Sequence, residues 1–316
     1  MSQVHGLAAA VERNIQQVMV GKHREIQYVL VALLAGGHIL VEDVPGVGKT
    51  TLVRALARSL GCQFRRIQFT PDLLPSDVTG VSVFNQGSGQ CEFRPGPIFS
   101  QVVLADEINR TSPKTQSALL ESMEESQVTV DGVTRPLPRP FLVLATQNPI
   151  EYEGTFPLPE AQLDRFLLRL QIGYPRPEEE RLIVERSRQL PLEKLQAVAQ
   201  TEDVLQAQAQ VAEVFVEPSV QDYIVRVVQR TRQHPDVYLG ASPRGSIALS
   251  RSAQALALIR GRSYVTPDDV KELAPVTLAH RLILKPESRF YGGTPEKVLA
   301  DVLSQVPVPV ESAHAR

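Results

Sequence analysis

A chain of 316 residues with 43% hydrophobic residues is long enough to form two domains with substantial cores. Its 33 basic and 35 acidic residues give a net charge of −2 and are spread along the chain, which argues against a nucleic-acid partner held mainly by electrostatic attraction. The two cysteines form no CxxC pattern and no apolar run is long enough to cross a bilayer, so we expect a cytoplasmic protein without a disulfide framework, a zinc site or a membrane span.

The first strong local pattern is a glycine turn between a predicted strand and a predicted helix. Apolar residues recur at helical spacing up to Gly36-Gly37, and the apolar run 38–41 then predicts a strand. Residues 43–50 read Asp-Val-Pro-Gly-Val-Gly-Lys-Thr and lead into a helix with leucines at every fourth position. A strand, a turn ending in Gly-Lys-Thr and a helix together cradle nucleotide phosphates, so we expect ATP or GTP to bind here.

The turn assigns roles to individual residues. Lys49 supplies a positive charge for the β and γ phosphates, and Thr50 supplies a hydroxyl ligand for Mg²⁺. Asp43 stands where the general pattern has glycine, and Asp tolerates unusual turn dihedrals. A plain turn before a helix is the alternative, but a cation in the first helical turn is unfavourable unless an anion binds there. The expected nucleotide-binding residues of this segment are Pro45, Gly46, Val47, Gly48, Lys49, Thr50 and Thr51.

Two β-hairpins are predicted inside an otherwise alternating pattern of strands and helices. Residues 81–93 alternate around a glycine-rich turn, and residues 127–137 alternate around Asp131-Gly132, a strong hairpin signal. Each hairpin is either a structural sheet edge or a contact for a substrate or partner, and the sequence does not say which hairpin would touch a substrate.

The runs 101–105 and 141–146 are apolar without alternation, which is typical of strands buried on both faces of a parallel sheet. Asp106 and Glu107 follow the first run, so Asp106 is expected to hold Mg²⁺ and Glu107 to polarise the attacking water. Asn148 follows the second run, where it would orient the water or sense the γ-phosphate, although Asn148-Pro149 is also a good turn.

Two arginines are candidates for contacts with the nucleotide. Arg165 follows a short predicted helix and precedes another apolar strand, and its alternative role is an ordinary surface ion pair. Arg244 falls in the first turn of the helix that Ser242-Pro243 opens, where a bound anion would explain a cation and exposure to solvent is the alternative. Strand-like runs stop near Tyr174, and the rest of the chain predicts helices.

These elements in this order resemble the MoxR family of AAA+ ATPases over nearly the whole chain, and that family commonly carries Asp at the position of Asp43. The stretches that carry the resemblance are 36–50, 106–110, 145–149, 163–166, 240–244 and 264–270.

The resemblance implies a parallel-sheet αβα nucleotide domain at residues 1–174 with hairpin inserts near 81–93 and 127–137. A helical lid at 175–305 and a flexible tail at 306–316 would follow. Asn148 would be the first sensor, Arg244 the second, and Arg165 an arginine finger that reaches the γ-phosphate of a neighbouring subunit. Val20 and Gly21 match the stretch that contacts adenine. Whether Arg244 acts within its own subunit or across the interface stays open.

The function implied is a Mg²⁺-dependent ATP hydrolase that works as a ring, expected to be a hexamer, and remodels, assembles or activates protein complexes. The family also implies a protein client, among which proteins with a von Willebrand factor A domain are candidates. The alternatives are a nucleic-acid motor and a nucleotide-gated scaffold with little turnover. The hairpin turns carry no cation, which argues against the motor, and the sequence identifies neither the client nor the ring size.

Overall fold

The centre of the protein is a five-stranded parallel sheet with the strand order β2-β5-β8-β1-β9. The computed structural model describes residues 2–87, 89–148, 154–186 and 192–309. Every neighbouring pair of these strands is parallel, which confirms the predicted fold class. In this order the strands are β2 (Phe64–Gln68), β5 (Val102–Asp106), β8 (Leu142–Gln147), β1 (Ile39–Glu42) and β9 (Leu168–Leu170).

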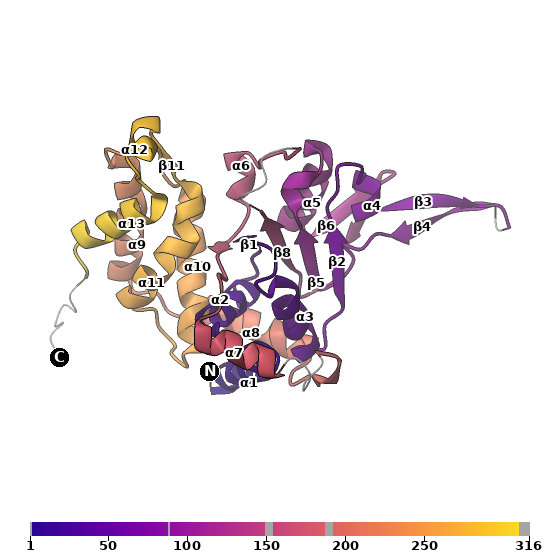
Figure 1. Cartoon of the computed structure of the whole chain (residues 1–316), viewed down its shortest axis with the longest axis horizontal. Helices are drawn as coiled ribbons and strands as arrows, with labels where there is room; N and C mark the ends of the chain where they lie inside the picture. Colours follow the sequence, from indigo (N-terminus) through magenta and orange to yellow (C-terminus); the bar gives the residue numbers. More distant parts are fainter. Residues whose placement is uncertain (1, 88, 149–153, 187–191, 310–316) are drawn as a thin grey trace.

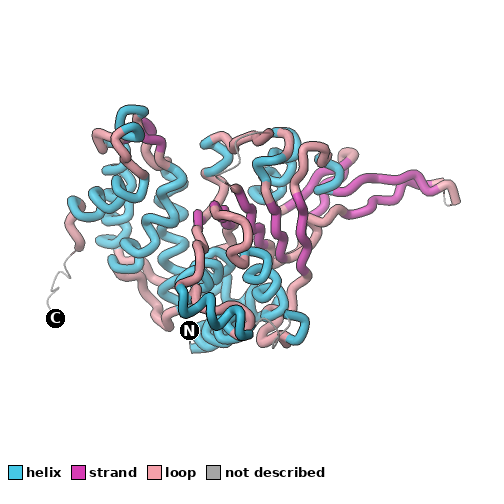
Figure 2. The backbone as a smooth tube through the Cα atoms, viewed as in Figure 1, coloured by secondary structure: helices cyan, strands magenta, loops and turns pink. Residues whose placement is uncertain are grey.

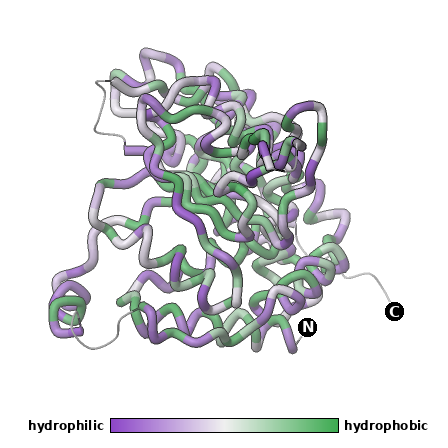
Figure 3. Tube along the Cα trace, turned by 90° about the vertical axis from the view of Figure 1, so that its right-hand side faces the viewer, coloured by the Kyte–Doolittle hydropathy of each residue, from purple (hydrophilic) through white to green (hydrophobic). Residues whose placement is uncertain are grey.

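Helices cover both faces of the sheet because successive residues of each strand point to opposite sides. Ile39 and Val41 pack toward α1 to α3, whereas Leu40 packs toward α4 and α5. Figure 2 shows the strands between the two layers, and Figure 3 shows that the middle strands are hydrophobic along their length. The helices of these layers are α1 (Ser2–Gln16), α2 (His23–Leu34), α3 (Lys49–Ser59), α4 (Pro75–Thr79) and α5 (Pro113–Glu125).

Both predicted hairpins are present. The first consists of β3 (Gly80–Asn85) and β4 (Gln90–Pro95) and projects away from the sheet (Figure 1). The second consists of β6 (Gln127–Val130) and β7 (Val133–Pro136), and its two turn residues have the positive φ angles that the Asp-Gly pair predicts. The guanidinium of Arg135 stacks on the ring of Phe93 at 3.9 Å, so the hairpins contact each other.

The rest of the chain is mainly helical, as predicted. The side chain of Ser242 caps α10, and Thr266 and Asp269 cap α11 reciprocally, so both predicted helix starts are confirmed. A short antiparallel pair, β10 and β11, was not predicted. The helices and short elements of this half are α6 (Glu160–Leu163), α7 (Pro177–Arg186), α8 (Thr201–Glu213), α9 (Pro218–Gln233), β10 (Val237–Leu239), α10 (Pro243–Ile259), α11 (Pro267–Leu278), β11 (Ile283–Leu284), α12 (Pro286–Phe290) and α13 (Pro295–Gln305), with 3₁₀ turns η1 (Ile108–Arg110), η2 (Leu192–Lys194) and η3 (Ala279–Arg281).

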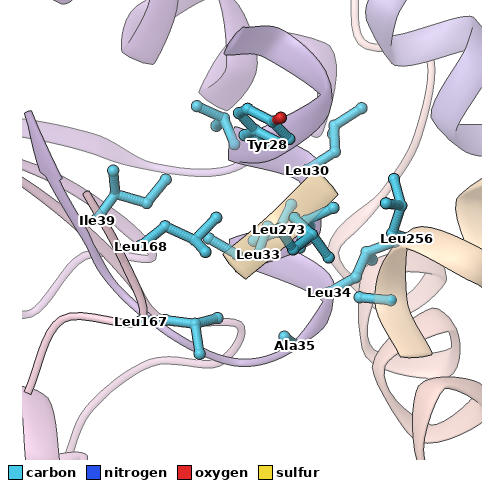
Figure 4. Close-up of a cluster of buried hydrophobic side chains, with 14 of the residues drawn as sticks. Tyr28, Leu30, Leu33, Leu34, Ala35, Ile39, Leu167, Leu168, Leu256 and Leu273 are labelled. Carbon is cyan, nitrogen blue, oxygen red and sulfur yellow. The ribbon is translucent and has the colours of Figure 1, made fainter. Parts of the chain in front are cut away.

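The helical half packs on the sheet domain through α2 and through a direct contact of α11 with β9. Figure 4 shows residues of α2 clustered with Ile39 and Leu168 of the strands and with Leu256 and Leu273 of the lid helices. One continuous apolar cluster therefore runs from the sheet into the lid, and the boundary between residues 174 and 175 stays a prediction. Val306, where the flexible tail is predicted to begin, is still buried, and residues 310–316 lie outside the described part of the chain.

His38 marks the edge of the sheet at which the strands begin, which we call the amino edge. Its Nε2–H donates to the carbonyl of Met123 at the end of α5, and its Nδ1 accepts the N–H of Val143 at the start of β8. Burial lowers the pKa of His38 to about 4. The C-terminal end of α5 therefore lies at the amino edge. The opposite edge, at which the strands end, is called the carboxyl edge.

Within the described residues we find no helix that combines the length and the apolar character needed to cross a bilayer.

Candidate functional site

The glycine turn forms as its sequence predicts. It joins the end of β1 to Lys49, the first residue of α3, and both Gly46 and Gly48 have φ near +90°. This left-handed backbone is strained for any residue with a Cβ, which explains the two glycines. The first N–H groups of α3 have no partner within the helix, so they are available to an anion in front of it.

A cavity of about 380 Å³ lies in front of this helix at the carboxyl edge of the sheet. A volume of this order is enough for a small ligand. The cavity brings together six residues of the turn and helix and five residues that lie in β2, β5 and β8 or directly after them. Its lining comprises Pro45, Gly46, Gly48, Lys49, Thr50, Thr51, Arg66, Asp106, Glu107, Thr146 and Asn148.

Lys49 is oriented by the turn itself. Its Nζ donates to the carbonyl of Asp43 at 2.9 Å and to the carbonyl of Val44 at 3.2 Å. Val47, which was expected to take part in the site, is nearly buried in the apolar cluster and does not line the cavity. The remaining predicted residues of the turn all do.

Asp106 and Glu107 lie side by side at the end of β5, and Thr146 at the end of β8 holds both. The Thr146 hydroxyl donates to Oδ1 of Asp106 at 2.6 Å and accepts the N–H of Glu107 at 2.8 Å. Thr146 is buried, so this bridge fixes the two acidic residues relative to β8. Asn148 also lines the cavity and is buried, while Pro149, the second residue of its predicted turn, lies outside the described residues.

Two residues of β2 contact the acidic pair, and sequence reasoning missed both. Arg66 donates to Oδ2 of Asp106 from Nη2 at 2.5 Å and from Nε at 3.1 Å. Gln68 donates to Oε2 of Glu107 at 2.9 Å, and Arg110 donates to the same oxygen at 2.9 Å. β2 is an edge strand with exposed arginines, so it lacks the apolar run that revealed the other strands.

Arg165 and Arg244 lie together, away from the cavity. Arg165 forms an ion pair with Glu124 of α5, and Arg244 forms another with the same carboxylate at 2.9 Å. Arg165 precedes β9, and Ile39 of β1 pairs in parallel with Leu168, so Arg165 is at the amino edge. The cavity follows the end of β1 at the carboxyl edge. Neither arginine lines it.

The residue before Arg165 is joined to the lid. Arg281, which is buried, forms an ion pair with Asp164 and donates to the carbonyls of Asp164 and Phe166. The hydroxyl of Ser242, which caps the helix of Arg244, donates to Asp164 at 3.2 Å. The two arginines are thus part of one network between the sheet domain and the lid.

Val20 and Gly21 do not line the cavity, but the loop that contains them lies close to the turn. A Cβ on Gly48 would meet the side chain of Met19 at 3.8 Å, which places the residue before Val20 beside the phosphate turn. Their predicted contact with adenine stays a prediction.

The donor set fits a nucleotide with a divalent cation. Helix N–H groups and Lys49 suit phosphate oxygens, and the oxygens of Thr50 and Asp106 are the ligands that Mg²⁺ prefers. Among the described residues no group of three His, Cys, Asp or Glu side chains could hold a metal alone. A magnesium ion bound together with phosphates needs only one or two protein ligands.

Two family models and several curated relatives match this chain. The family model for the ATPase family associated with various cellular activities (AAA) matches residues 38–168, and the model for an AAA lid domain matches residues 229–302. An uncharacterized protein of Bacillus subtilis, YeaC, is 56% identical over 99% of this chain and 98% of its own length. Chaperone MoxR1 of Mycobacterium tuberculosis is 45% identical over 99% of this chain and 85% of its own.

A solved structure supports the same assignment. The crystal structure of a candidate ATPase from Cytophaga hutchinsonii superposes with a TM-score of 0.91 at 40% identity, covering 97% of this chain and 96% of the other. With the sheet order, the phosphate turn and the helical lid in place, the chain belongs to the MoxR family of AAA+ ATPases.

Proposed function

We propose that this protein binds ATP with Mg²⁺ in the cavity at the carboxyl edge and hydrolyses it. The observation that carries the proposal is the convergence of Lys49, Thr50, Asp106, Glu107 and Asn148 on one cavity from three separate segments of the chain. Lys49 and the N–H groups of the turn would bind the phosphates, and Glu107 and Asn148 would position the attacking water.

Magnesium, when bound, would neutralise charge that develops on the phosphate oxygens. Thr50 and Asp106 are the residues that would hold it. Arg66 contacts Asp106 from β2, so this arginine and the cation would compete for the same carboxylate oxygen.

We further propose that the active site is completed by a second copy of the chain. Arg165 and Arg244 lie at the amino edge, and a strand of four residues separates this edge from the cavity by on the order of 13 Å. An arginine at the amino edge cannot neutralise phosphates at the carboxyl edge of its own sheet without crossing that distance. Both arginines would therefore act on the nucleotide of a neighbouring subunit, and contact in this head-to-tail manner closes into a ring.

The shared contact with Glu124 also bears on the open question of Arg244. Because Arg244 binds the same carboxylate as Arg165, the two guanidiniums are presented from one surface of one subunit. This supports action of Arg244 across the interface together with Arg165.

The proposed substrate of the ring is a protein complex that it remodels, assembles or activates. MoxR1 is named a chaperone, and proteins with a von Willebrand factor A domain remain candidates for the client. A nucleic-acid motor is the less favoured alternative, because the described residues of the hairpin turns carry no lysine or arginine and the net charge of the chain is −2.

The test is ATP hydrolysis measured against protein concentration. We expect the rate per subunit to rise steeply with concentration, because an arginine from another subunit typically contributes about 10³-fold or more to the rate. Glu107→Gln should retain ATP binding and lose at least about 100-fold in hydrolysis, whereas Glu121→Gln on the exposed face of α5 should behave like the wild type. A rate near zero at every concentration would instead support the nucleotide-gated scaffold.

The same variant tests the class of client. Glu107→Gln with ATP should hold its client, and recovery of a protein from it would support the remodelling role. Recovery of nucleic acid without any protein would contradict that role.

A further inference from the structure

Asp43 makes contacts that a phosphate turn alone does not require. Its carboxylate is buried and accepts three backbone N–H groups, from Val44 at 2.9 Å, Ile172 at 2.6 Å and Gly173 at 2.7 Å. Two of these donors belong to the segment that leaves the sheet after β9, almost 130 residues further along the chain. The residue that replaces glycine in the turn therefore joins the turn to that segment.

Lys22 holds the same segment through its carbonyl groups. Its Nζ donates to the carbonyl of Ile172 at 2.7 Å and to the carbonyl of Tyr174 at 3.1 Å. Asp43 thus binds the N–H groups of Ile172 and Gly173, and Lys22 binds the carbonyl groups of Ile172 and Tyr174. We call this set of bonds the 172–174 clamp.

The 172–174 clamp is one hydrogen bond away from Lys49, the lysine that is proposed to bind phosphate. Lys49 Nζ donates to the main-chain carbonyl of Asp43, and the carboxylate of the same residue accepts from Ile172 and Gly173. A phosphate group that binds Lys49 and the turn therefore acts on Asp43, the residue that binds segment 172–174. Such a chain of two hydrogen bonds is a physical route for coupling between the two places.

Segment 172–174 connects the sheet to α7 and the lid. Gly173 has a φ of +67°, and a Cβ built there would meet nothing within 4 Å, so only the backbone conformation calls for glycine at this position. α7 begins three residues later and has no buried residue, so the clamp and the buried side chain of Ile172 fix where this connection begins. Residues that absorb changes of backbone angle between two domains typically occur at such positions.

We propose that Asp43 and Lys22 are positioning residues that couple occupation of the phosphate turn to the connection between the sheet domain and the lid. This inference rests on the proposed binding of phosphate at the turn. A bound phosphate fixes the turn through Lys49 and the helix N–H groups, and a fixed turn keeps the Asp43 carboxylate on Ile172 and Gly173. Opening of these two N–H groups should then become rarer when phosphate is bound.

Hydrogen exchange at the amides of Ile172 and Gly173, measured by NMR with inorganic pyrophosphate and Mg²⁺, tests the coupling. Pyrophosphate has no base or ribose that could touch the segment directly, so any protection must come through the turn. At saturating pyrophosphate we expect exchange at both amides of the wild-type protein to slow roughly ten-fold or more.

Asp43→Gly separates phosphate binding from the clamp, because it restores the glycine of the general phosphate-turn pattern and removes the carboxylate. This variant should still bind pyrophosphate, while exchange at the two amides is fast and does not respond. Asp43→Asn, which keeps the volume but offers one acceptor oxygen in place of two, provides a second readout should the glycine variant fold poorly. Lys22→Met, which keeps the chain length without the donor, should also speed exchange at the segment.

The matched control is Asp203→Asn, since Asp203 also accepts a backbone N–H, from Gln200, but does so on α8. It should leave the response of Ile172 and Gly173 unchanged. Wild-type protein that binds pyrophosphate without any change at the two amides would overturn the coupling, as would an unchanged response in Asp43→Gly. Wild-type protein that binds neither pyrophosphate nor ATP in calorimetry would instead overturn the proposed function.

Discussion

Arg165 forms an ion pair with Glu124 of its own chain, with 3.1 Å between Nε and Oε2, at the edge of the sheet opposite the phosphate turn. The same carboxylate binds Arg244. Arg165 and Arg244, which are proposed to act in catalysis, therefore lie away from the nucleotide cavity of their own chain.

Complementation between two inactive variants tests the placement of Arg165. Lys49→Ala should lose phosphate binding, and Arg165→Ala should lose about 10³-fold in hydrolysis. A mixture of the two should recover activity, because some interfaces then combine an intact Lys49 with an intact Arg165. Hydrolysis of ATP by the mixture is the measurement, and a mixture with Arg226→Ala, an exposed arginine of α9, in place of Arg165→Ala is the control. A mixture of the first two variants that stays inactive at every concentration would refute action across the interface.

Glu124→Gln should make assembly of the active form easier. The carboxylate has to release both arginines before they can bind a neighbour's phosphate, and partly exposed ion pairs contribute only about 0.2–1 kcal/mol each. The protein concentration at half-maximal ATPase activity should therefore fall by about two- to thirty-fold. Glu125→Gln, at the exposed neighbouring position, should leave it unchanged. A large loss of activity at saturating concentration would show instead that Glu124 holds the arginines in their productive positions.

Arg66→Met should lower the magnesium concentration needed for half-maximal activity. Arg66 and Mg²⁺ are proposed to compete for Oδ2 of Asp106, and methionine cannot form that ion pair. Titration of ATPase activity with MgCl₂ is the measurement. Arg65→Met is the matched control, because neighbouring residues of a strand point to opposite faces. An unchanged magnesium dependence of Arg66→Met would contradict the competition.

Stability should fall as the pH is lowered from about 6.5 to about 4. The pKa of both His38 and His280 is lowered to about 4, mainly by burial, and the positive charge of Arg169 contributes to the lowering at His280. The unfolded chain takes up protons at these histidines below about pH 6.5, while the folded chain does so only near pH 4, so protonation favours unfolding across this range. The free energy of unfolding should decrease by on the order of 3 kcal/mol per histidine over the whole range.

Urea unfolding at a series of pH values measures this decrease. His38→Gln offers both a donor and an acceptor to the partners of His38 and does not titrate, so its stability should depend less steeply on pH. An equal slope for His38→Gln and the wild type would refute the role of His38.

Local patterns predicted most of the fold because they arise from backbone chemistry that acts over a few residues. The glycine turn, the Asp131-Gly132 hairpin and the caps at Ser242 and Thr266 all require particular residues at particular dihedral angles. Strand β2 escaped prediction because it is an edge strand, in which Arg65 and Arg66 replace the apolar residues of the central strands. α1 and the pair β10–β11 were also not predicted.

The candidate site was predictable where residues follow a strand or a turn, and less so where distant segments meet. Asp106, Glu107 and Asn148 could be placed at one edge from the parallel arrangement alone. The contacts of Arg66 with Asp106 and of Arg244 with Glu124 depend on how whole elements pack, since 40 and 120 residues separate the partners. No local pattern contains that information.

The buried contact between Arg281 and Asp164 gives the proposed ring a direction. Arg281 belongs to the lid, and Asp164 is bonded directly along the chain to Arg165. A change in the orientation of one lid would thus displace the arginine that is proposed to serve the next subunit. The position of each lid would in this way reach the nucleotide of a neighbour, in one direction around the ring.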